Sequence, residues 1–172
     1  MKLLVALFCL CLAGNAAAAP KPDVIYVPTP QPVVDAMLEM AKVGPGDVLY
    51  DLGSGDGRIP ITAAKRFGVR AVGIEIDPAL AREASHQAWR QKLDKLATFR
   101  TADLFTTDLS EATVVTLYLL DSVNLRLRPK LLSELKPGTR VVSHAFHMGD
   151  WKPDQEREVD GNMIYMWTVP AH

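Results

Sequence analysis

A short segment of the chain alternates acidic residues with glycines, a pattern suited to holding a ligand against the backbone. The segment is Asp51-Leu52-Gly53-Ser54-Gly55-Asp56-Gly57, and it follows the apolar run Val48-Leu49-Tyr50. Glycine at every second position lets the backbone approach a ligand closely, and the helix predicted from about Gly57 to Phe67 points its free amides at the same place. The segment therefore predicts a ligand-binding strand, loop and helix.

The acidic residue before the first glycine indicates what kind of ligand the loop suits. A dinucleotide-binding fingerprint would have its third glycine where this chain has Arg58, and it would not have Asp51 two residues before Gly53. A carboxylate at this point repels a pyrophosphate and attracts a cationic group. The loop therefore favours a ligand with a free amino group over NAD.

Two further acidic residues follow the next two predicted strands. Glu75 lies at the end of the strand Ala71 to Ile76, where a carboxylate can accept both hydroxyls of a ribose. Asp103 follows the strand Ala97 to Thr101, beside apolar residues that could hold a purine ring while the acid accepts its exocyclic amine. Because the carboxyl ends of parallel strands meet at one edge of a sheet, we expect these acids to converge on one crevice.

The elements that must position these residues alternate along the chain between helix and strand. The hydrophobic spacing predicts one helix from about Pro32 to Lys42, a second after the N-cap Asp77 and a third from near Pro129. It predicts further strands over Thr113 to Leu120 and Arg140 to Phe146. A closing hairpin is predicted from Glu156 to Val159 and from Met163 to Val169. The hairpin turn, Asp160-Gly161, is of type I′. This order predicts an α/β fold with a doubly wound, mostly parallel sheet and a reversed edge strand.

Taken together, these segments resemble the seven-stranded, Rossmann-like, S-adenosylmethionine-dependent methyltransferases. The glycine loop is similar to their first motif, Gly73-Ile74-Glu75-Ile76-Asp77 to their second, and Ala102-Asp103-Leu104 to the motif that contacts adenine. More narrowly, Tyr26-Val27-Pro28-Thr29-Pro30, Tyr118-Leu119-Leu120 and the stretch from Gly138 to His144 with Trp151 resemble one small family. It includes the protein-lysine methyltransferases of the mitochondrial ATP synthase c-subunit and adenine nucleotide translocase.

The resemblance implies S-adenosylmethionine as the cofactor and methyl transfer to a nucleophile, most simply a protein lysine amine. It implies that Asp51 with Gly53, Gly55 and Gly57 would hold the methionine end, and Glu75 the ribose. Asp103 and Leu104 would hold the adenine, and Tyr26 and Thr29 would close over the cofactor. A small-molecule N- or O-methyltransferase, and a cofactor-binding protein of the same fold that does not catalyse, remain the alternatives.

The methyl acceptor should approach the rim after the fourth strand, where Tyr118, Asp121 and Asn124 are the candidate catalytic residues. Equally, Tyr118 could belong to the core, and the other two could cap the next helix. His144 and His147 could contact substrate, but a third ligand at a suitable spacing is missing, so we predict no metal site.

Composition and the first residues set the wider expectations. The chain has 172 residues, 48% of them hydrophobic, and a formal net charge of −1, which predicts one globular domain without a general attraction for nucleic acid. Lys2, the apolar run after it and the alanines up to Ala19 predict a signal peptide over residues 1–19 and a single methyltransferase domain over 20–172. We therefore expect an exported monomer with a protein substrate and no membrane span, unless an uncleaved leader anchors it.

Overall fold

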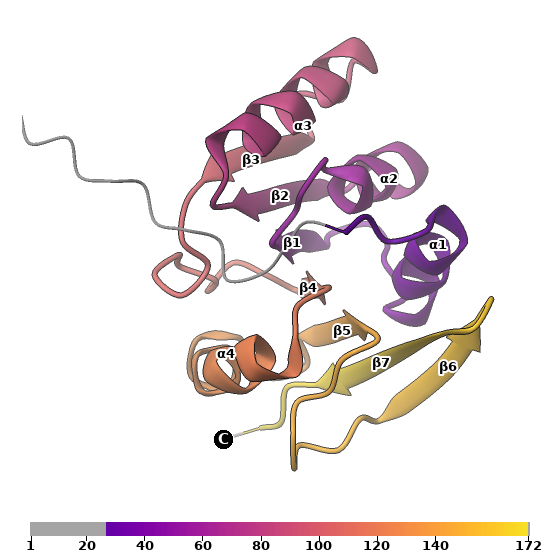
Figure 1. The fold of residues 1–172 in the computed structure, drawn as a ribbon, viewed down its shortest axis with the longest axis vertical. Coiled ribbons are helices and arrows are strands. Elements are labelled where there is room, and N and C mark those ends of the chain that lie inside the picture. Colours follow the sequence, from indigo (N-terminus) through magenta and orange to yellow (C-terminus); the bar gives the residue numbers. More distant parts are fainter. Residues whose placement is uncertain (1–26, 172) are drawn as a thin grey trace, which may run out of the picture.

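The computed structural model describes residues 27–171, which fold around one seven-stranded sheet (Figure 1). The helices are α1 (Gln31–Met40), α2 (Arg58–Phe67), α3 (Pro78–Arg90) and α4 (Asp121–Glu134). The strands are β1 (Val48–Leu52), β2 (Arg70–Glu75), β3 (Ala97–Thr101), β4 (Val114–Leu117), β5 (Arg140–His144), β6 (Gln155–Val159) and β7 (Asn162–Thr168). None of the helices in this range is long and apolar enough to cross a membrane.

The strand order confirms the predicted fold class. It runs β3-β2-β1-β4-β5-β7-β6, with β1 to β5 parallel and β7 antiparallel to both of its neighbours. The chain moves outward from β1 to β3 and then returns to place β4 on the other side of β1. Such a reversal opens a crevice at the carboxyl ends of the strands, which is where α/β sheets of this kind bind ligands.

Helices cover both faces of the sheet, with α1, α2 and α3 on one side and α4 on the other (Figure 1). Successive β1 side chains point to opposite faces, so Leu49 belongs to the apolar cluster that contains Val34 of α1, while Tyr50 belongs to the cluster that contains Leu127 of α4. Both layers are apolar, as expected for parallel strands that are buried on both faces. The segment between β3 and β4 contains no helix, and Leu109 fills the space beside α4.

Three predicted boundaries differ from the structure at the carboxyl edge of the sheet. The strand predicted over Thr113 to Leu120 ends at Leu117, because the chain leaves the sheet there and enters α4 at Asp121. The helix therefore begins eight residues before Pro129, which lies inside it. The prediction was wrong because packing of the buried first half of α4 outweighs the preference of proline for a first turn. β5 ends at His144, since Ala145 turns to a positive φ of 64°.

The closing hairpin is confirmed with its predicted turn. Asp160 and Gly161 have φ values of 50° and 77°, the pair of left-handed conformations that defines a type I′ turn. β7 lies between β5 and β6, and Asn162 and Ile164 of β7 therefore come beside the end of β5. The hairpin thus both closes the sheet and brings residues distant in sequence to the rim that carries the crevice.

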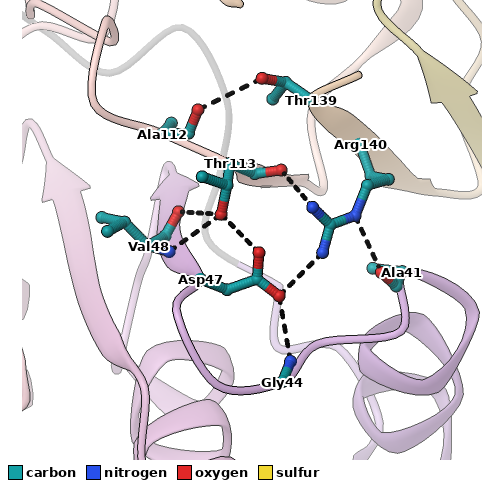
Figure 2. A network of polar contacts seen from close by, with 8 residues as sticks. All are labelled: Ala41, Gly44, Asp47, Val48, Ala112, Thr113, Thr139 and Arg140. Atoms are coloured by element: carbon teal, nitrogen blue, oxygen red, sulfur yellow. Dashed lines mark hydrogen bonds and ion pairs between the residues drawn. The ribbon is translucent and has the colours of Figure 1, made fainter.

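A polar network fastens the opposite edge of the sheet, where β1, β4 and β5 begin (Figure 2). Asp47 accepts hydrogen bonds from the Gly44 amide at 3.0 Å, the Thr113 hydroxyl at 2.7 Å and the Arg140 guanidinium at 2.8 Å. Arg140 also donates to the carbonyls of Ala41 and Thr113. Burial disfavours the charged carboxylate, but these hydrogen bonds outweigh it and lower the pKa of Asp47 from 3.8.

Candidate cofactor-binding site

The carboxylate of Asp51 is buried at the end of the central strand β1. Its side chain is 3% exposed, and the Thr116 hydroxyl of β4 donates a hydrogen bond to Oδ1 at 2.7 Å. Burial, together with the charges of the neighbouring carboxylates Glu75 and Asp56, raises the pKa of Asp51 to about 7, although the Thr116 hydrogen bond lowers it. A buried acid in this state would be stabilised in its charged form by a cationic ligand.

Glu75 ties the end of β2 to the glycine loop. Its Oε2 accepts from the Gly55 amide at 2.8 Å, and its Oε1 accepts from the Asp77 amide at 2.9 Å. Each carboxylate oxygen can accept a second hydrogen bond, so the side chain keeps capacity for two hydroxyls while it shapes the loop. The role predicted for Glu75 thus combines with a structural one that its position in the sequence did not indicate.

Asp103 and Leu104 lie at the third strand end, as the sequence predicts, and both line the same cavity as Asp51 and Glu75. The Phe105 amide donates to Oδ1 of Asp103 at 2.8 Å, which leaves the second carboxylate oxygen for another donor. The Phe105 ring also lines the cavity, and the guanidinium of Arg126 lies 4.2 Å from its centroid. An acid beside two apolar side chains can accept an amine while it packs against a flat ring.

The three glycines of the loop have different surroundings. Gly53 lines the cavity, and a Cβ added to it would lie 3.0 Å from Cδ2 of Leu119. Gly55 and Gly57 do not line the cavity. Gly57 has a φ of 80° and packs so tightly that an added Cβ would lie 2.5 Å from Cζ of Phe99. Of the predicted glycines, only Gly53 reaches the cavity wall, and Gly57 instead allows α2 to pack near β3.

The segment before α1 closes one side of the cavity. Thr29 is 4% exposed and lines the cavity, and its carbonyl accepts from Nη1 of Arg58 at 2.8 Å. Arg58 also forms an ion pair with Asp56 at 2.7 Å. Tyr26, the other residue predicted to close over the cofactor, lies outside the described residues.

The three candidate catalytic residues are not brought together. Tyr118 lines the cavity, and its ring stacks on that of His144 with the centroids 3.9 Å apart. Asp121 is exposed and accepts from the His147 amide at 2.8 Å, whereas Asn124 is fully buried and donates to the His147 carbonyl at 3.3 Å. Neither of these two lines the cavity, and both hold the loop that follows β5.

The cavity has a volume of about 370 Å³ and carries a strong excess of negative charge. Among the described residues, one guanidinium, that of Arg58, and five carboxylates line it: Asp51, Asp56, Glu75, Asp77 and Asp103. The volume falls in the range of small-molecule sites. S-adenosylmethionine offers an ammonium, a ribose diol and an adenine amine as donors, and the acids at the ends of β1, β2 and β3 are acceptors for all three. The residues present therefore fit this cofactor.

The strand order and this cavity define a seven-stranded, Rossmann-like, S-adenosylmethionine-dependent methyltransferase. The sequence profile described as the ANTKMT methyltransferase domain matches residues 51–155, and the chain belongs to that family.

Named relatives agree with this assignment. The chain is 51% identical to a protein-lysine N-methyltransferase of Saccharolobus islandicus, over 88% of this chain and 97% of that protein. It is 34% identical to the lysine N-methyltransferase of the ATP synthase c-subunit from Xenopus laevis, over 88% of this chain and 66% of that protein. A crystal structure described as an RNA methyltransferase from Salinibacter ruber with S-adenosyl-L-homocysteine is 58% identical, with a TM-score of 0.84 over 85% of this chain and 95% of that one.

Sequence reasoning missed several residues of the cavity. Ser54 lines it with a buried hydroxyl that has no hydrogen-bond partner in the described part of the chain. Arg58 and Leu119 line it as well. Leu119 lies beyond the end of β4 at Leu117, which is three residues before the predicted end at Leu120. The sequence distinguishes Arg58 only as a departure from a dinucleotide fingerprint. The early end of β4 and the contact of the Arg58 side chain with the segment before α1 are tertiary features that have no local sequence signal.

Proposed function

We propose that the protein transfers the methyl group of S-adenosylmethionine to the side-chain amine of a protein lysine. The observation that carries this proposal is the acidic lining of the cavity, which includes five acidic residues and one arginine. Such a site attracts a cationic side chain and repels a polyanion. The protein-lysine N-methyltransferase that is 51% identical over nearly its whole length supports the same substrate class.

The bound cofactor supplies a methyl group on a positively charged sulfur, which is electrophilic without further activation. The side chains of Asp51, Glu75 and Asp103 would hold its amino group, ribose and adenine. The remaining task of the protein is to position the acceptor amine and exclude water. Tyr118 directly follows β4, and Thr29 lies 3.3 Å from His144 at the end of β5, so both line the cavity near these two strand ends.

An acceptor lysine reacts only as the neutral amine. Its ammonium would be drawn to the acidic cavity, and desolvation against the ring of Tyr118 would then favour loss of the proton to solvent. Tyr118 is half-buried and held by stacking on His144, so its position is defined before substrate arrives. Because the proton is lost to solvent, this mechanism requires no general base among the protein side chains.

RNA methylation is the second candidate, because the 58% identical crystal structure is described as an RNA methyltransferase. One experiment separates the two: the protein is incubated with S-adenosylmethionine carrying a labelled methyl group and with either protein or RNA extracted from the same cells. Label in protein, recovered as methyl-lysine after hydrolysis, supports the proposal. Label in RNA alone refutes it, and label only in small molecules would favour the metabolite alternative.

Two variants make this assay specific. Asp51→Asn removes the buried charge of the cavity and should abolish most labelling at neutral pH. Asp94→Asn is the matched control, since Asp94 is an exposed acid just before β3, at the opposite end of the sheet. Equal labelling by the two variants would show that the label does not come from this site.

We further propose that residues 1–19 are a signal peptide and that the domain acts outside the cytosol as a monomer. These residues lie outside the described range, and the proposal rests on their tripartite sequence pattern. Cell fractionation with N-terminal sequencing tests it, and a mature protein that begins at Pro20 is the expected result. Retention of Met1 in a membrane fraction would indicate an anchor instead, and gel filtration gives the oligomeric state.

A further inference from the structure

A buried histidine connects the segment before α1 to the closing hairpin. His144, at the end of β5, is 1% exposed. Its Nδ1 lies 3.3 Å from the Thr29 hydroxyl, and its Nε2 lies 3.2 Å from Oδ1 of Asn162. The three residues come from parts of the chain that are far apart in sequence, so the connection exists only in the folded protein.

The hydrogen-bond pattern determines which ring nitrogen carries the proton. The Asn162 amide nitrogen donates to the Asp160 carbonyl in the type I′ turn at 3.0 Å, so its oxygen must face His144. An amide oxygen can only accept, which requires that Nε2 of His144 donate. Burial lowers the pKa of His144 from 6.5 and thus favours the neutral ring, so Nδ1 keeps its lone pair.

This polarity fixes the state of the Thr29 hydroxyl. Its single hydrogen is donated to Nδ1 of His144, and only its lone pairs remain available. Thr29 lines the cavity beside Tyr118, whose ring stacks on the same histidine. The hydroxyl is therefore an acceptor near the end of β5, where His144 lies.

We propose that Asn162 and His144 are positioning residues that hold the Thr29 hydroxyl as a hydrogen-bond acceptor for an amino group in the cavity. The inference deepens the proposed lysine methylation and rests on it, because a lysine amine entering beside Tyr118 would donate to Thr29 and turn its lone pair towards the methyl group. The amino group of the cofactor could donate the same hydrogen bond to Thr29, so the experiment must distinguish it from a lysine amine.

Two binding measurements distinguish the sources and do not need an identified substrate protein. The first titrates the complex with S-adenosylhomocysteine with n-butylamine, which represents the lysine side chain. The second compares the affinities of S-adenosylmethionine and methylthioadenosine, which lacks the amino acid portion. Thr29→Val should weaken n-butylamine binding about tenfold, a larger loss than for either nucleoside, whereas Thr29→Ser should bind like the wild type. Weakened binding of S-adenosylmethionine alone would assign the hydroxyl to the cofactor's amino group, and no change in either measurement would overturn the proposal.

Variants of the histidine separate positioning from packing. His144→Phe keeps a ring against Tyr118 but offers no acceptor, whereas His144→Asn can place an oxygen near the position of Nδ1. The proposal expects loss of n-butylamine binding in the first variant and partial rescue in the second. Thermal melting reports whether each variant folds, and Thr29→Val tests the same hydrogen bond if His144→Phe does not.

Nitrogen NMR of the imidazole gives a readout that is independent of ligands. We expect the shifts of a neutral ring with the proton on Nε2, and Asn162→Leu should remove this preference. A proton on Nδ1 in the wild type would refute the role of His144 in orienting the Thr29 hydroxyl, even if lysine methylation is found. Conversely, absence of any methylated protein would refute the proposed function. The tautomer of His144 and the binding of n-butylamine would still test the positioning of Thr29.

Discussion

Cofactor affinity should depend on pH through one buried carboxylate. Asp51 is 3% exposed, and burial, together with the charges of Glu75 and Asp56, raises its pKa to about 7. A cofactor that carries an ammonium binds the ionised form of this acid and holds it ionised. Because the free protein must lose a proton before or during binding, affinity rises with pH until Asp51 is ionised in the free protein as well.

The size of the effect follows from the pKa. An acid with a pKa of about 7 is about one-tenth ionised at pH 6 and about nine-tenths ionised at pH 8. The dissociation constant of S-adenosylmethionine should therefore fall about tenfold between these values and change little above pH 8. The free energy of unfolding depends on pH in the opposite direction. Because the pKa of Asp51 in the folded protein lies above 3.8, its contribution to stability is present below pH 4 and is lost as the pH rises through 7.

Isothermal titration calorimetry from pH 5.5 to 8.5 measures the dependence directly, with buffers of different ionisation enthalpy reporting the released proton. Asp51→Asn is the control, because it keeps the shape of the site and cannot ionise, so any remaining pH dependence belongs to the cofactor. Thr116→Val should move the transition to higher pH, since the Thr116 hydroxyl favours the charged carboxylate. Identical pH profiles for the wild type and Asp51→Asn would refute this account of the site.

Three further predictions concern other parts of the molecule. Gly57→Ala places a Cβ 2.5 Å from Phe99 at a positive φ, and should lower the free energy of unfolding by about 2 to 4 kcal/mol in urea titrations, with unchanged cofactor affinity in the folded fraction. Arg140→Leu should cost about 2 kcal/mol at pH 7, and the difference should shrink below pH 4 as Asp47, whose pKa is lowered, becomes protonated. Tyr118→Leu removes the ring and should reduce the methyl-transfer rate in single-turnover assays at least about tenfold, whereas Tyr118→Phe keeps the ring and should not; an unchanged rate in Tyr118→Leu would remove the ring from the reaction.

Local patterns were sufficient for much of the fold and for the prediction that the acids at three strand ends lie around one cavity. The glycine loop, the N-cap Asp77 and the Asp160-Gly161 turn act within a few residues, so their geometry follows from the chemistry of those residues. The acids at the ends of β1, β2 and β3 must meet, because parallel strands place their carboxyl ends together. The family resemblance also rested on these short motifs.

The acceptor half was decided only by the tertiary structure. Asp121 and Asn124 follow the fourth strand in sequence, yet the early start of α4 turns both towards the loop after β5 and away from the cavity. His144 acquired its contacts with Thr29 and Asn162 because β7 inserts beside β5 and the segment before α1 crosses the sheet edge. The physical reason is that such contacts depend on long-range packing, whose outcome no short stretch of sequence contains.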